Sequence, residues 1–222
     1  MIRAVIFDFD GTLVDTETPW YQTLCEIYEE HGSKYTYEMW GRAVGTKGSD
    51  LYSELERFVG KAVNRSELDS RRRVRHAELM AKSGLRPGAL AYLRDAKDRG
   101  LKIGLASSSQ RSWVDQYLER FGIQDYFCSI LTGDDVHHVK PHPELYMKSL
   151  ELLGVQPNEA LSFEDSPNGA RAAESANISC VVVPNESTEK LSFGAYRLRL
   201  SSMSEMDLGV VLRIIDERRP PH

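Results

Sequence analysis

The chain has 222 residues, of which 41% are hydrophobic and 27% charged, so it can form one large domain or one domain with a smaller insert. The formal net charge of −5 argues against nucleic-acid binding. The sequence does not start with a basic segment followed by a long apolar stretch, which argues against a signal peptide and a membrane partner. Three widely spaced cysteines in no metal-binding pattern favour a reducing compartment, and we expect a cytoplasmic protein.

A first strand is predicted at residues 4–9, where a short run is apolar on both faces. After it come only helical patterns. The first helix starts at Thr18 and Pro19 and ends at Gly32, and a second, over residues 49–60, has Phe58 in its apolar stripe. A third spans about residues 66–83. Together they form a helical insert that is too long to be a loop.

The third helix of this insert contains the basic cluster of residues 71–75. A charge run of this kind predicts a solvated helix face, with a patch for a partner or a phosphate as the alternative.

From residue 85 onward, short apolar runs alternate with well-punctuated helices. The predicted helices occupy residues 87–100, 109–122 and 143–154, and the predicted strands are residues 102–108, 128–135, 160–165 and 180–184. This alternation predicts an α/β fold with a doubly wound, mainly parallel sheet. We therefore expect a core of residues 1–16 and 85–222, with residues 17–84 as an inserted all-helical unit and candidate hinges near residues 15–18 and 84–87.

Polar residues follow the predicted strands, at the edge of a parallel sheet where ligands bind. They are Asp8, Asp10, Gly11 and Thr12 after the first strand, Ser107, Ser108 and Ser109 after the second, Asp134, Asp135 and then Lys140 after the third, and Glu164, Asp165 and Ser166 after the fourth. Carboxylates, hydroxyls and one ammonium group on a single edge suit a hard divalent cation and a phosphate group.

Asp8 and Asp10 are two residues apart, so both side chains point the same way on an extended chain. A cation between Asp8 and Asp165 would keep Asp8 ionised as a nucleophile, while Asp10 could protonate a leaving oxygen. The amides after Ser107, beginning at Ser108, and the ammonium of Lys140 could bind phosphate oxygens.

Each motif also has an ordinary structural interpretation. The segment at Asp8 to Gly11 could be a turn, the serines at 107–109 a helix N-cap, and Trp113 an ordinary core or rim residue. The presence of four such motifs at the ends of four predicted strands favours a functional site over four separate structural roles.

The segments "DFDGTLVD", "LASSS", "VKPHPELY" and "FEDSPNGARAA" closely resemble, in order, the four motifs of the haloacid dehalogenase superfamily. The insert resembles the helical cap of the subfamily that includes β-phosphoglucomutase and many small-molecule phosphatases. The resemblance implies phosphoryl transfer through an aspartyl-phosphate on Asp8, with Asp10 as the proton shuttle. It further implies Mg²⁺ held by Asp8, Asp10 (through its carbonyl), Asp165 and Glu164, and phosphate oxygens bound by Ser107, Ser108 and Lys140.

The resemblance leaves several functions open. We expect an Mg²⁺-dependent phosphatase acting on a small phosphate monoester, such as a sugar phosphate. A phosphomutase is the alternative, disfavoured because Trp20 stands near the histidine usual in mutases and the cap loop lacks their arginine. A non-catalytic member is a third possibility, although no motif residue is missing. Trp20, Arg42 and Lys47 are candidates to face the substrate, and a monomer is expected.

Overall fold

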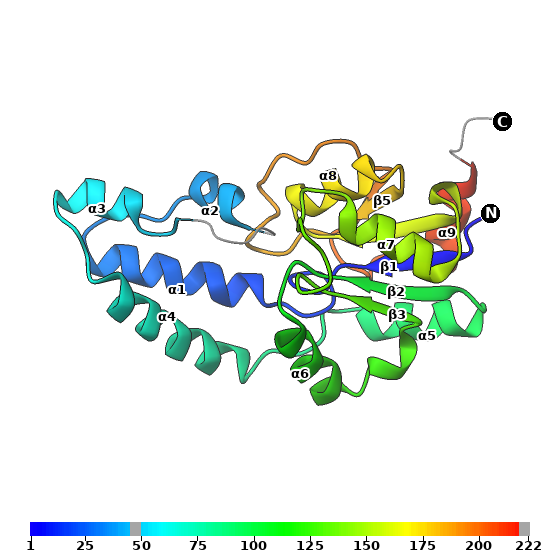
Figure 1. Cartoon of the computed structure of the whole chain (residues 1–222), viewed down its shortest axis with the longest axis horizontal. Helices are drawn as coiled ribbons and strands as arrows, with labels where there is room; N and C mark the ends of the chain where they lie inside the picture. The colour runs from blue at the N-terminus through cyan, green and yellow to red at the C-terminus, as the bar shows by residue number, and fades with distance from the viewer. Residues whose placement is uncertain (45–49, 218–222) are drawn as a thin grey trace.

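The computed structural model describes residues 1–44 and 50–217. Its sheet is parallel throughout, with the strand order β3-β2-β1-β4-β5-β6 (Figure 1). The strands are β1 (Ala4–Phe7), β2 (Lys102–Ala106), β3 (Ser129–Leu131), β4 (Ala160–Glu164), β5 (Ser179–Val182) and β6 (Leu198–Arg199). The doubly wound α/β fold is therefore confirmed, and among its strands only the two-residue β6 at the edge was not predicted.

Both faces of the sheet are covered by helices because successive side chains of each strand point to opposite faces. Val5 and Phe7 of β1 pack into one apolar cluster, and Ala4 and Ile6 into another. The first cluster includes residues of α5 (Ala89–Asp98), α6 (Arg111–Phe121) and α9 (Leu208–Glu217), and the second residues of α7 (Glu144–Leu153) and α8 (Pro167–Ser175). Since β1 lies at the centre of the sheet, the residues that follow it lie at the middle of the carboxyl edge.

Residues 17–80 form four helices with an apolar cluster of their own: α1 (Glu17–Glu30), α2 (Tyr37–Ala43), α3 (Ser53–Val59) and α4 (Arg65–Met80). They extend away from the sheet, on the side opposite to the two chain termini (Figure 1). The short helix α2 was not predicted. Phe58 was predicted to belong to the apolar stripe of α3, but it is 59% exposed because α3 buries only Leu55.

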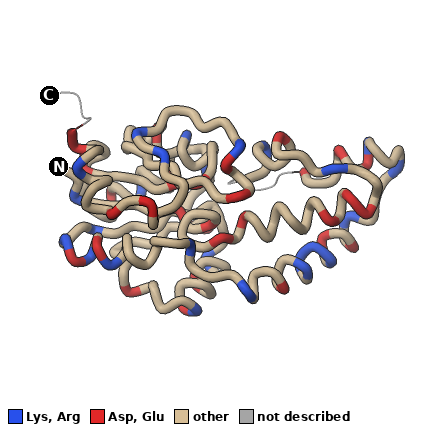
Figure 2. The backbone as a smooth tube through the Cα atoms, turned by 180° about the vertical axis from the view of Figure 1, so that it is seen from behind, with Lys and Arg blue, Asp and Glu red and all other residues tan. Residues whose placement is uncertain are grey.

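The basic cluster of residues 71–75 faces two different environments. Arg71 and Arg75 are exposed and form ion pairs with Glu30 and Glu26 of α1 at 2.5 and 2.9 Å, so basic α4 lies beside acidic α1 (Figure 2). Arg72 is only 7% exposed. The prediction of a solvated face was therefore right for the outer arginines and wrong for Arg72.

The two connections between the helical segment and the sheet run side by side. The Ser83 hydroxyl donates to the Asp15 carbonyl at 3.1 Å, and the Arg86 amide donates to the Leu13 carbonyl at 2.8 Å. Asn177, which ends the turn after α8, adopts a left-handed backbone with φ of 59°, a conformation for which asparagine is the usual second choice after glycine. Among the described helices, none is both long enough and apolar enough to cross a membrane.

Candidate active site

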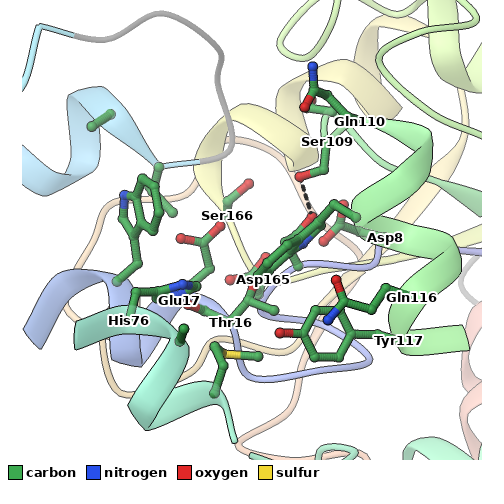
Figure 3. Close-up of a pocket in the computed structure, with 18 of the residues that line it drawn as sticks. Asp8, Thr16, Glu17, His76, Ser109, Gln110, Gln116, Tyr117, Asp165 and Ser166 are labelled. Carbon is green, nitrogen blue, oxygen red and sulfur yellow. Dashed lines mark hydrogen bonds between the residues drawn. The ribbon is translucent and has the colours of Figure 1, made fainter. Parts of the chain in front are cut away.

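A cavity of about 990 Å³ lies between the carboxyl edge of the sheet and the helical segment. Asp8 and Asp165 border it from the ends of β1 and β4, as Figure 3 shows at the centre of the view. Glu17 and His76 border it from α1 and α4, and the side chains of α6 border it from the opposite side (Figure 3). The cavity therefore combines side chains from segments more than 100 residues apart.

Lys140 is the cation at the base of this site, and it is only 1% exposed. Its ammonium group lies 2.5 Å from Asp8 Oδ1 and 2.7 Å from Glu164 Oε1, and it donates to the Ala106 carbonyl at 2.7 Å. Burial alone would lower the pKa of Lys140, but Asp8 and Glu164 raise it above its usual value, so this group is charged. Tyr146 of α7 donates to Glu164 Oε1 at 2.5 Å, and Glu164 Oε2 has no hydrogen-bond partner among residues 1–44 and 50–217.

Three buried carboxyl groups, Asp8, Glu164 and Asp165, have ligand atoms within 4.8 Å of one another. Burial is the main cause that raises the pKa of Asp8 to about 8, although Lys140 acts in the opposite direction. Burial, together with repulsion from Asp8, raises the pKa of Asp165 well above its usual value. The positive charge of one ammonium group therefore does not balance the negative charge of three carboxylates at this place. The cluster is suited to bind an additional cation through its carboxyl oxygens.

Gly11 lets the Asp165 carboxyl group approach the turn after β1. Its φ is +79°, and a Cβ atom at this position would lie 2.1 Å from Asp165 Oδ2. Asn185 donates to the same Oδ2 at 2.6 Å, and Thr12 donates to Oδ1 at 3.4 Å. The turn thus brings the carboxyl group at the end of β4 against the loop that carries Asp8 and Asp10.

The Asp10 carboxylate accepts hydrogen bonds from both sides of the cavity. Oδ1 accepts from the Thr16 hydroxyl at 3.0 Å and from the Trp113 indole N–H at 2.8 Å. Oδ2 accepts from the Ser107 hydroxyl at 3.1 Å and the Ser109 hydroxyl at 2.7 Å, the latter contact drawn in Figure 3. These bonds fix the orientation of Asp10 beside Asp8, with α6 supplying the indole.

This arrangement agrees with the comparison with protein families. A family described as "Haloacid dehalogenase-like hydrolase" matches residues 5–183 of the chain. The chain is a haloacid dehalogenase-like hydrolase. The resemblance of its four motifs is thereby confirmed, and so is its identification as an enzyme.

Several proteins similar to this hydrolase have phosphatase or phosphomutase names. A Bacillus subtilis protein whose name describes it as a phosphatase, YhcW, is 51% identical over 96% of this chain and 97% of its own length. The "Phosphorylated carbohydrates phosphatase" of Thermotoga maritima is 33% identical over 80% of this chain and 82% of its own. The solved β-phosphoglucomutase of Clostridium difficile has a TM-score of 0.72 at 25% identity and covers 98% of both chains.

The residues predicted from the four motifs lie together. Asp8, Asp10, Lys140 and Asp165 border the cavity, and Glu164 lies directly behind Lys140. Ser107 is fully buried with its hydroxyl on Asp10, whereas Ser108 and Ser109 border the cavity. The N-cap of α6 is Gln110, so the alternative of a serine N-cap was wrong.

Other predicted residues lie elsewhere. Asp134 and Asp135 do not join the site, because they bond to the backbone and the guanidinium group of Arg111 at the start of α6. Of the three substrate-facing candidates, Trp20 borders the cavity. Arg42 instead pairs with Glu38 and Glu54 on the surface of the helical segment, and Lys47 lies outside the described residues.

The sequence analysis missed several residues that position the site. Trp113 packs at the rim of the core as expected, but its indole also reaches Asp10. Arg86 donates to the carbonyls of Gly11 and Val183 at 2.7 and 2.6 Å and so ties the turn after β1 to the end of β5. Asn185 follows the last predicted strand, so the strand-end rule that found Asp165 could have found it too.

Proposed function

We propose that this hydrolase is an Mg²⁺-dependent phosphatase that cleaves a small phosphate monoester through an aspartyl-phosphate on Asp8. One observation carries the proposal. Asp8 lies at the floor of a large cavity, paired with the buried Lys140, and the firmly oriented Asp10 carboxylate is the next side chain on the same face. A nucleophile, a cation for phosphoryl oxygens and a proton-transfer group are thus within reach of one reacting phosphorus.

The residues present fit a divalent cation. Asp8, Glu164 and Asp165 are buried with one ammonium group among them, and in the described part of the chain Glu164 Oε2 lacks a hydrogen-bond partner. Hard oxygen donors of this kind suit Mg²⁺. We propose that Asp8, Asp165 and the Asp10 carbonyl hold the ion, with Glu164 as a further ligand or neighbour. When bound, the ion would offset negative charge on the phosphoryl oxygens.

Residues of the chain carry out nucleophilic attack, proton transfer and binding of the phosphoryl oxygens. Asp8 Oδ attacks phosphorus while the bond from phosphorus to the alcohol oxygen breaks, and Asp10, which enters this step in its protonated form, gives its proton to the departing alcohol oxygen. Asp10 then takes a proton from the water that hydrolyses the aspartyl-phosphate, which frees inorganic phosphate. Lys140 and the backbone amide of Ser108, which follows Ser107, bind the phosphoryl oxygens.

We also propose that residues 17–84 act as a cap over a core of residues 1–16 and 85–222. The hydrogen bonds of two side chains support this role. Asn168 at the start of α8 donates to the Val44 carbonyl at 2.8 Å, and Arg120 of α6 donates to the carbonyls of Met80, Ala81 and Ser83 at 3.0, 2.9 and 3.1 Å. A closed cap would exclude bulk water from the reacting groups.

The names of similar proteins support a phosphorylated metabolite as the substrate, because one of them is a phosphatase of phosphorylated carbohydrates. A phosphomutase remains the alternative, supported by the similarity to a solved β-phosphoglucomutase. Incubating the enzyme with glucose 1-phosphate, Mg²⁺ and a hexose bisphosphate separates the two. A phosphatase releases inorganic phosphate, whereas net isomerisation without free phosphate would identify a mutase.

The main test is hydrolysis of an aryl phosphate with Mg²⁺ by wild type and by Asp8→Asn. We expect activity in wild type and a loss of at least about a thousandfold in the variant, because the nucleophile is removed. Asp134→Asn is the matched control, since this aspartate also follows a strand but lies away from the cavity. An inactive wild type, or full activity in Asp8→Asn, would reject the proposal.

A further inference from the structure

A second cluster of metal-ligating side chains lies on the loop that leads into α7, outside the residues that border the active-site cavity. It consists of His138, His142 and Glu144, each of which offers one ligand atom, and these atoms lie within 4.8 Å of one another. The two histidines are exposed and Glu144 is half-buried, so the cluster is accessible from solvent. All three belong to one short segment, residues 138–144.

The Glu144 carboxylate is oriented by the backbone of the same loop. The amides of His137 and His138 donate to its Oε1 and Oε2, both at 3.0 Å. Pro141 and Pro143 stand between the ligands and restrict the backbone of the loop. Because each carboxylate oxygen can accept more than one bond, the carboxylate is held in place with lone pairs still available to a cation.

The two imidazole rings lie close to each other and to this carboxylate. The ring centres of His138 and His142 are 4.8 Å apart. His138 Nδ1 lies 3.5 Å from Glu144 Oε2, and His142 Nδ1 accepts the Glu144 amide at 3.3 Å. The ligands of a tetrahedral Zn²⁺ ion lie about 3.3 Å apart, since metal–ligand distances are about 2.0–2.2 Å. Small rotations of the two exposed rings therefore suffice to bring all three ligand atoms onto one ion.

The donor atoms indicate which kind of metal suits the cluster. Imidazole nitrogens together with a carboxylate suit Zn²⁺ and related transition metals, whereas Mg²⁺ prefers oxygen ligands. The active-site cluster, by contrast, consists of carboxyl groups. Lys148 Nζ lies 3.3 Å from Glu144 Oε1, so its ammonium group competes with a cation for this oxygen. The uncharged imidazole nitrogens therefore provide the selectivity of the cluster for a transition metal.

We propose that these three side chains form a site for a divalent transition-metal cation such as Zn²⁺, separate from the proposed Mg²⁺ site, and that the ion holds the loop that carries Lys140. Lys140 lies midway between the two histidines in the sequence, and its ammonium group is buried against Asp8. An ion that joins both ends of this loop stabilises its folded conformation, because the unfolded chain offers no preformed site. This inference does not depend on the phosphatase activity.

The first test is a Zn²⁺ titration in competition with a chromophoric chelator, with excess Mg²⁺ to occupy the active-site carboxylates. We expect wild type to bind one Zn²⁺ per chain and His142→Ala to bind it at least about 100-fold more weakly, since loss of even an indirect partner of a ligand costs about 10- to 100-fold in affinity. His137→Ala is the matched control, because its amide still donates to Glu144 while its ring is outside the cluster, and its affinity should equal that of wild type. Lys148→Met removes the competing ammonium group and should bind Zn²⁺ more tightly.

Two further measurements identify the ligands and the effect on the loop. With Co²⁺ in place of Zn²⁺, we expect visible absorption bands without a thiolate charge-transfer band, because the ligands are imidazole and carboxylate groups. In thermal unfolding with excess Mg²⁺, Zn²⁺ should raise the Tm of wild type but not that of His142→Ala.

Three results would overturn the proposal. The first is a wild type that binds no Zn²⁺ in excess Mg²⁺, or that binds it no more tightly than His142→Ala does. The second is a thiolate band with Co²⁺, which would place the ion on a cysteine such as the exposed Cys128. The third is an unchanged Tm of wild type at saturating Zn²⁺, which would refute the role of the ion in holding the loop.

Discussion

In the absence of divalent cations, the free energy of unfolding should decrease as the pH rises from about 6.5 to about 8. The cause is the buried carboxyl group of Asp8, whose pKa is raised from 3.8 to about 8, chiefly by burial. At a pH between these two pKa values, Asp8 holds a proton in the folded chain that it has lost in the unfolded chain. Stability therefore falls with rising pH through this window, and Asp165 and Glu17, whose pKa values burial also raises, act in the same direction.

The size of the effect follows from the pKa of Asp8. One unit of pKa difference corresponds to about 1.4 kcal/mol, so Asp8 alone contributes a loss of about 1.5–2 kcal/mol between about pH 6.5 and 8. Burial lowers the pKa of His76, which opposes this trend by less than about 0.5 kcal/mol because an ordinary histidine is already half deprotonated near pH 6.5. The raised pKa of Lys140 has no effect until the pH is much higher. A net loss of about 1–2 kcal/mol lowers the Tm of a chain of this size by roughly 2–8 °C.

The assay is thermal unfolding in EDTA and in excess Mg²⁺ at both pH values. We expect the Tm in EDTA to be lower at the higher pH, and Mg²⁺ to raise the Tm more there, because a bound cation compensates the ionised carboxylates. Asp8→Asn removes the titrating group and should flatten the dependence in EDTA. A Tm in EDTA that is equal or higher at about pH 8, or an unchanged slope in Asp8→Asn, would refute the reasoning.

Three substitutions test how the site is positioned. Trp113→Phe keeps an aromatic ring but removes the donor to Asp10, and steady-state kinetics should show kcat reduced about tenfold, since three other donors remain. Arg120→Met frees three carbonyls at the end of α4, and we expect KM for an aryl phosphate to rise roughly 3- to 10-fold while kcat changes less. Gly11→Ala places a Cβ atom against Asp165 at a φ of +79°, so thermal unfolding should show a loss of more than about 1 kcal/mol and no stabilisation by Mg²⁺.

The sheet and the four motifs could be predicted because their signals are local. Each central strand is a short apolar run, and each candidate site residue follows such a run, so the topology of a parallel sheet brings Asp8, Lys140 and Asp165 together. The left-handed backbone at Asn177 could be predicted for the same reason, since it depends only on the end of one helix.

The cap side of the site could not be predicted, because helical periodicity does not say what a helix packs against. Arg72 stands among other arginines in the sequence, and the Trp20 ring that covers its guanidinium group comes from a different helix. Trp113 fits the pattern of an ordinary core or rim residue of α6, and nothing in that pattern indicates a contact with Asp10. Phe58 also fits a stripe, but its side chain is largely exposed on the short α3.

The most direct test of the central claim is to detect the phosphoryl group on Asp8. The enzyme is mixed with a phosphate monoester and Mg²⁺, quenched in acid within the first turnover, digested, and analysed by mass spectrometry. We predict that the peptide containing Asp8 gains the mass of one phosphoryl group, and that no such peptide forms with Asp8→Asn. Release of inorganic phosphate with no phosphorylated peptide, or with the phosphoryl group on another residue, would contradict the proposed mechanism.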